Sequence, residues 1–149
     1  MALKLKLEGF DDLLKKIEKA GGDIDRVTKY ALRKSADVMQ KELEEQMTLT
    51  DDSRFGTTVT LIKRLPPPQL EIDYGKYTAH VGYKETAYNP DNPSDYHKAI
   101  FLNYGTPYRT KHGVIKARGF VNKAKRRAKP KIKKLQKEAL EKILARLKK

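Results

Sequence analysis

The stretch DIDRVTKYALRKSADVMQKELEEQM, Asp23 to Met47, gives the clearest indication of the fold that we expect for this chain. Asp23 belongs to the residue types that cap helix N-termini, and Asp25 suits the first turn of a helix. Apolar residues follow at helical spacing in two adjacent stripes: Ile24, Val27, Ala31 and Val38, and beside them Leu32, Ala36, Met39, Leu43 and Met47. Together they are wider than the stripe of a helix that lies on one sheet. We therefore expect a long helix with two neighbours, the second of which can be another subunit.

The residues before this helix predict a strand and a short helix. Between Leu3 and Leu7, leucine alternates with lysine, which is the period of a strand with one buried face. Gly9 ends that pattern. Apolar residues then recur at helical spacing from Phe10 to Ile17, and Gly21-Gly22 ends this second element.

The residues after the long helix predict a polar loop and three strands. TLTDDSRFG, beginning at Thr48, has loop composition, and the strands are expected at Thr58–Leu65, Leu70–Tyr74 and Tyr77–Tyr83. Pro66-Pro67-Pro68 cannot donate ladder hydrogen bonds, so it should be a connector at a sheet edge. AYNPDNPSD, beginning at Ala87, is rich in turn residues and should be exposed.

The apolar stretch AIFLNYGTPYR, Ala99 to Arg109, ends abruptly in Gly-Thr-Pro. We favour a short helix here over a strand, because Ser94 can cap its start and Gly105 is the residue type that commonly follows a helix end. The sharp stop then turns the chain out of the core.

The last part of the chain predicts a basic helix. Phe120 begins a helical stretch, Pro130 should break or kink it, and an amphipathic helix should follow to the C-terminus. The order of elements predicts a single α+β domain over residues 1–149, in which a small antiparallel sheet is packed by the long N-terminal-half helix and the basic C-terminal helix.

The charge of the chain lies at one end. The net charge is +14, and residues 111–149 contain 16 Lys and Arg against two acids, which equals the whole excess. Residues 1–110 form a neutral body. Such asymmetry favours a polyanionic partner, either nucleic acid or an acidic protein surface.

The residue types that carry catalysis or bind metals do not form a recognisable pattern. The chain has no cysteine, and its histidines, His80, His97 and His112, are far apart, so we read one as a strand-face residue and two as loop residues. No phosphate-binding glycine loop or nucleophile motif is present. We therefore expect no enzyme activity, no metal and no cofactor. With no long apolar stretch and no signal-like start, we expect no membrane association and synthesis in the cytoplasm.

The densest basic segment is KAKRRAKPKIKK, which begins at Lys123. Its eight basic residues are Lys123, Lys125, Arg126, Arg127, Lys129, Lys131, Lys133 and Lys134. Without interleaved aromatic or base-reading residues, such a segment can contact phosphates only, so its DNA affinity should be independent of sequence and fall with salt. The alternative is a solvated helix that contacts an acidic partner or only keeps the protein soluble.

Tyrosines gather in the middle third of the chain. Tyrosine is enriched at protein interfaces, so a subunit interface is predicted at Tyr83, Tyr88, Tyr96 and Tyr108. The alternative is that these residues fill half-buried faces of strands.

The order of elements, with Phe101 before Tyr104-Gly105-Thr106 and with Lys116-Ala117-Arg118-Gly119-Phe120, resembles the neck and tail-completion proteins of long-tailed bacteriophages. This resemblance covers essentially the whole chain. It implies a virion protein, made in the host cytoplasm, whose copies form a ring between the head connector and the tail. The ring would surround the channel through which double-stranded DNA passes. Its partners would be copies of itself and the adjoining head-connector and tail proteins.

Two other classes of function remain open from the sequence. One is a sequence-independent nucleic-acid-binding protein that uses the basic C-terminal segment. The neutral, tyrosine-rich body suits protein contacts better than phosphate contacts. The other is a regulatory or toxin-like enzyme, which the missing catalytic pattern disfavours.

Overall fold

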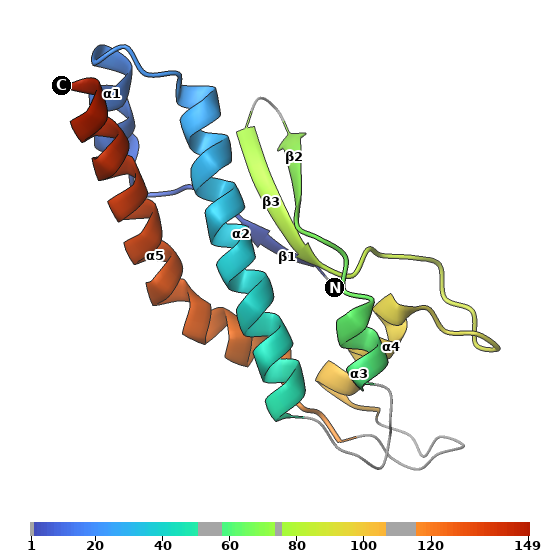
Figure 1. Ribbon diagram of the computed structural model, residues 1–149. Coiled ribbons are helices and arrows are strands. Elements are labelled where there is room, and N and C mark those ends of the chain that lie inside the picture. Colours follow the sequence, from blue (N-terminus) through green and yellow to red (C-terminus); the bar gives the residue numbers. More distant parts are fainter. Residues whose placement is uncertain (1, 51–57, 74–75, 107–115) are drawn as a thin grey trace.

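The computed structural model describes residues 2–50, 58–73, 76–106 and 116–149, and it has the α+β architecture expected from the sequence. Figure 1 shows two long helices side by side, with the sheet against one of them. In chain order the elements are β1 (Ala2–Leu5), α1 (Asp11–Lys19), α2 (Ile24–Leu49), α3 (Thr58–Lys63), β2 (Gln69–Asp73), β3 (Lys76–Gly82), α4 (Asp95–Tyr104) and α5 (Phe120–Leu147).

The sheet is antiparallel, and its strand order is β1-β3-β2. β3 is therefore the central strand. Leu5 of β1 and Leu70 of β2 are both register partners of Ala79, which is fully buried. Since directly opposed residues lie on the same face of a sheet, these three residues mark the face that meets the helices. The prolines at 66–68 precede an edge strand, as predicted.

The long helix α2 lies between the sheet and α5 (Figure 1). The Asp23 carboxylate accepts hydrogen bonds from the backbone N–H groups of Asp25 and Arg26 at 3.1 and 3.3 Å, which confirms the predicted N-cap. The apolar surface of α2 is wide because α2 packs on the sheet with one side and on α5 with another. Its second neighbour is thus a helix of the same molecule, and no further subunit is needed to explain the wide stripe.

The sequence predicted either a break or a kink at Pro130, and the structure shows that α5 runs through this residue without a break. Proline has no N–H group to bond the carbonyl group four residues earlier, that of Arg126. Both residues are exposed, so water can hydrate this carbonyl group. The ribbon of α5 changes direction in its orange part (Figure 1). The buried side of α5 is narrow, with residues mostly four apart: Phe120, Val121, Ala124, Ala128, Ile132, Gln136, Leu140 and Leu144.

The segment Thr58–Leu65, predicted as a strand, instead forms helix α3 and a turn that follows it. The β-branched residues of this segment favour a strand by propensity, but propensity is a weak constraint beside packing. Leu61 and Leu65 are four residues apart and both are buried in the core. A helical turn places both side chains on one side, where they meet the core.

Two apolar clusters hold the fold together. The larger one joins α2, α3, α4, the sheet and the first half of α5, and Leu32, Leu61, Val81 and Phe120 are among its fully buried members. The smaller one joins α1, the start of α2 and the last turns of α5 around Ile17 and Leu140. The C-terminal helix therefore contacts both ends of the core.

Candidate interaction surfaces

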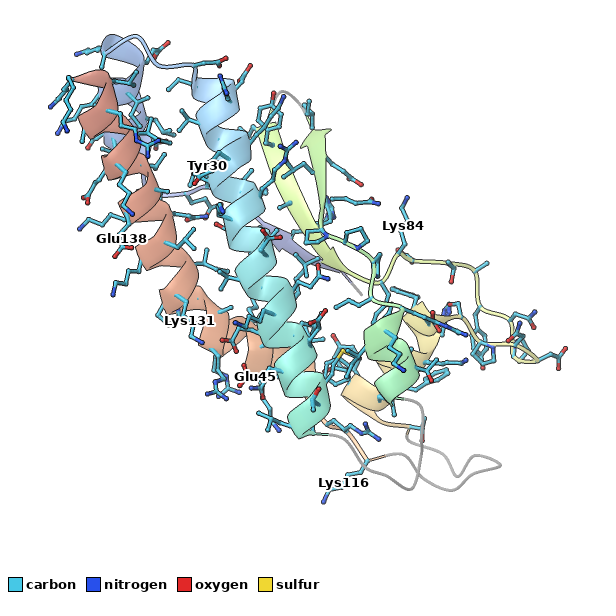
Figure 2. All side chains as sticks on the ribbon, viewed as in Figure 1. Tyr30, Glu45, Lys84, Lys116, Lys131 and Glu138 are labelled. Carbon is cyan, nitrogen blue, oxygen red and sulfur yellow. The ribbon has the colours of Figure 1, made fainter. Side chains whose placement is uncertain are left out.

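The basic face of α5, which we define as the eight lysine and arginine residues between Lys123 and Lys134, is exposed at every position. Ala124, Ala128 and Ile132 lie between these residues in the sequence and are buried against the core. Because these buried residues form only a narrow stripe, the lysines and arginines occupy the rest of the helix surface. Lys131 and Glu138 are labelled on α5 in Figure 2.

Lys131 is the member of this face that is tied to the rest of the fold. Its ammonium group forms an ion pair and hydrogen bond with the Glu42 carboxylate, whose side chain is only 5% exposed. A second polar contact joins the same helices, because Gln136 donates a 2.9 Å hydrogen bond to the Ser35 hydroxyl group. The other seven residues of the face have no ion pair within the described ranges.

The residues that carry the resemblance to phage proteins lie where α4 ends and α5 begins. Gly105 follows α4 with φ of 76°, a left-handed value that favours glycine, and its N–H bonds to the Phe101 carbonyl at 2.8 Å. Phe120 is 1% exposed and anchors the first turn of α5 in the core. Tyr104 is 65% exposed. Phe101 and Thr106 are half-buried.

Asn103, which the sequence reasoning did not single out as a site, joins these two helices. It is 3% exposed, and its side-chain oxygen accepts a 3.0 Å hydrogen bond from the Val121 backbone N–H. Gly119 stands at the N-cap of α5 and has no side chain to cap it. Asn103 supplies the missing acceptor from α4. The only signal in the sequence was a polar residue inside an apolar run.

Tyr83 belongs to the core and is not an exposed interface residue. It is 4% exposed, and its hydroxyl group donates a hydrogen bond to the Leu61 carbonyl group. Burial raises the pKa of Tyr83 above its ordinary value, and the charges of Asp95 and Glu44 raise it further. The interface predicted at Tyr83 is therefore corrected, because this residue, which directly follows β3, is buried in the larger core cluster.

The remaining predicted tyrosines differ in exposure. Tyr88 is 56% exposed, and its ring lies 5.0 Å from the His97 ring and 6.1 Å from the Phe101 ring. Tyr96 is half-buried against the core. Tyr88 thus fixes the projecting chain between β3 and α4 onto α4 while leaving much of its own ring exposed. Tyr108 lies outside the described residues.

Other large apolar side chains are exposed at positions that sequence reasoning did not select. They are Tyr30, Leu49, Ile72 and Leu147. Ile72 is 65% exposed although it alternates with charged residues as a half-buried strand residue would. The pattern predicted the strand correctly. Leu70, two residues earlier on the same face of β2, packs against the core, so the local pattern does not tell which of the two residues is exposed.

The histidines and carboxylates do not form a metal site in the described residues. His80 is on β3, as expected, and its Nε2 lies 3.2 Å from a Glu71 carboxylate oxygen. His97, predicted in a loop, is instead in α4, where its Nδ1 lies 3.0 Å from the Ser94 hydroxyl group. His112 lies outside the described residues. Among the described helices, none combines the length and apolar character of a membrane span.

Comparisons of this chain with protein-family models, with curated proteins and with solved structures found no match.

Proposed function

We propose that this protein is a structural virion protein of a tailed bacteriophage. In this proposal, its copies form a ring in the neck, which joins the head connector to the tail around the DNA channel. The protein acts through its surfaces and is not an enzyme. The sequence resemblance at Phe101, Tyr104-Gly105-Thr106 and Phe120 supports the family, and the distribution of surface residues supports the role.

The observation that carries the proposal is the difference between two sides of the molecule. Helix α5, which carries the basic face, lies on one side of α2, while β2, β3, α4 and the projecting chain lie on the other (Figure 1). Ile72, Tyr88 and Tyr104, all more than half exposed, belong to this second side. Exposed tyrosines are common at protein interfaces, and a basic face suits the phosphates of DNA. A ring subunit around a channel needs both kinds of surface.

The proposal is tested by the state of assembly. Sedimentation velocity and electron microscopy of the purified protein over a wide concentration range should reveal closed rings. The same measurement is made after addition of connector-bearing heads from the encoding virus, since a partner can nucleate the ring. A protein that stays monomeric in both experiments would contradict the proposal.

A second candidate function is sequence-independent binding of nucleic acid, which the exposure of the basic face of α5 favours. Fluorescence anisotropy with two unrelated DNA duplexes should then give equal affinities that fall with salt. Replacing Lys125, Arg126 and Arg127 with glutamine should reduce the slope of log affinity against log salt by up to about 0.9 per lost phosphate contact.

The matched control replaces Lys15, Lys16 and Lys19 of α1 with glutamine, which removes the same charge from another exposed surface. An equal reduction of the salt slope in both variants would mean that DNA binding depends on net charge and not on α5. Strong DNA binding by a protein that never assembles would favour this second function over the neck ring.

A further inference from the structure

In the part of the chain that the structure describes, both edge strands of the sheet are open. Since the strand order is β1-β3-β2, β1 and β2 each have a neighbouring strand on one side only within the described residues. An open edge exposes a row of backbone N–H and C=O groups that can pair with another strand. Each copy of this protein therefore has two places where a sheet can continue.

The two edges carry charges of opposite sign. β1 and the residue that follows it have the sequence Leu3-Lys4-Leu5-Lys6, whereas β2 contains Leu70-Glu71-Ile72-Asp73. Edge lysines are a common protection against aggregation, because edges of like charge repel each other. Here a basic edge and an acidic edge belong to the same molecule, so the edges of two copies attract each other.

The faces of these strands also match. Leu3 and Leu5 pack against the larger core cluster, as does Leu70. Lys4 is the register partner of His80, and Glu71 lies beside His80 at 3.2 Å, so both charged residues are on the outer face. Placing β2 of one copy beside β1 of another keeps apolar residues on one face and opposite charges on the other.

We propose that β2 of one copy pairs with β1 of the next copy, so that the sheet continues from subunit to subunit. This inference rests on the proposed function, because it names the contact that builds the ring. β1 and β2 both run antiparallel to β3, so a continued sheet joins them as a parallel pair. The contact is head-to-tail, and such contacts generate a ring when their rotation closes.

A groove along β1 provides space for the incoming strand. It has a volume of about 530 Å³ and lies between β1 and α5, with Met39 and Ile132 among its lining residues. Leu3 and Leu5 line it together with Lys4 and Lys6. Because these residues alternate between the two faces of β1, a groove that contacts all of them runs along the edge of the strand.

The chemistry of the groove agrees with an acidic, partly apolar strand. Besides Lys4 and Lys6, it is lined by Lys125, Lys129 and Lys133 of α5, against a single carboxylate, Glu8. On β2, Glu71 is exposed and Ile72 is 65% exposed, so both can contact a second molecule. In the paired state, the Ile72 side chain would leave water and contact the apolar residues of the groove. The Glu71 carboxylate would lie near the lysines that line the groove.

The test uses two charge-reversed variants and their mixture. Lys4→Glu with Lys6→Glu makes both edges acidic, and Glu71→Lys with Asp73→Lys makes both edges basic. Each variant alone should assemble only at a concentration at least about tenfold above that of the wild type. Mixed in equal amounts, they should assemble again with alternating copies, because each variant then meets an edge of opposite charge. Sedimentation velocity measures all three.

The controls separate this contact from general effects. Lys15→Glu with Lys41→Glu makes the same charge change on α1 and α2 and should assemble like the wild type. Circular dichroism and thermal unfolding report whether each variant is folded. If either charge variant unfolds, Ile72→Lys replaces it, since that side chain is already exposed and its substitution should block assembly without unfolding the protein.

The outcomes distinguish the contact from the proposed function. A wild-type protein that never assembles contradicts the neck ring itself. A wild type that assembles, with folded edge variants that assemble equally well, overturns the strand pairing and leaves the ring standing. The pairing is also overturned if both variants are folded and fail alone but their mixture does not recover, since the two edges would then not meet.

Discussion

The two long helices have similar lengths, 26 residues for α2 and 28 for α5, but they are buried in different ways. α2 lies between the sheet and α5, so it is covered on two sides (Figure 1). α5 is covered on one side only, along a stripe that includes Ala124 and Ala128. The number of covered sides therefore sets how much surface each helix can offer. α2 builds the core, and α5 keeps an exposed basic face.

The helices also begin differently. Asp23 caps α2 from the adjoining residue of the chain, whereas α5 begins after Gly119, at φ of 62°, and obtains its acceptor from Asn103 on α4. The start of α2 is therefore determined locally. The start of α5 depends on how α4 is packed.

The largest effect is expected for Leu32→Ala on α2. Leu32 is fully buried, so removal of its side chain leaves a cavity and should lower the free energy of unfolding by about 2–5 kcal/mol. Denaturant unfolding measures the change. Leu49→Ala, the same substitution at a 65% exposed position of the same helix, should change stability by less than about 0.5 kcal/mol. Equal losses at both positions would mean that α2 is not the central helix.

A smaller loss is expected for Ala128→Leu on α5. Ala128 is fully buried, so a larger side chain should force the helices apart and cost about 1–3 kcal/mol of unfolding free energy. Ala145→Leu, at an exposed position of α5, is the matched control and should be nearly neutral. An Ala128→Leu variant with unchanged stability would show that α5 does not pack closely through its buried alanines.

The two helix starts provide a third comparison. Asn103→Ala leaves a buried N–H group of Val121 without its acceptor and should cost about 1–3 kcal/mol. Asp23→Ala removes an exposed cap and should cost about 1 kcal/mol. Thermal and denaturant unfolding of the two variants test this order. The reverse order would show that α5 is not capped by α4.

The smallest effect is expected in the pH dependence of stability, through Tyr83, which is buried near the side of α2 that faces the sheet. Burial raises the pKa of Tyr83 in the folded protein, and charges including that of Glu44 on α2 add to this. Above pH 10 the unfolded chain loses the Tyr83 proton while the folded protein keeps it, so stability falls as the pH rises. This residue should contribute a slope of at most about 1.4 kcal/mol per pH unit.

Tyr83→Phe isolates this contribution from the many lysines that titrate in the same range. Stability measured between pH 8 and 11 should fall less steeply with pH in the variant than in the wild type (about 10 being the ordinary tyrosine pKa). Parallel curves for the two proteins would contradict the assigned burial of the hydroxyl group.

Local patterns predicted most of the elements because their signals are carried by neighbouring residues. Asp23 at the start of α2, Ser94 before α4 and Gly105 after α4 all have the roles expected from residue type alone. Alternation predicted β2 and β3, and the resulting α+β class is confirmed. The interface positions were less predictable, because Tyr83 and Tyr88 have the same residue type but opposite exposure.

The order of amino acids alone is enough to predict the fold class, the long helix and the one-sided charge, since caps, periodicity and composition act within a few residues. Tertiary packing makes Thr58–Lys63 helical, carries α5 through Pro130 and sets α5 beside α2 as its second neighbour. It also decided which strands lie at the sheet edges. These outcomes depend on contacts between residues far apart in the chain, whose packing energy exceeds the local preferences of the segments they join.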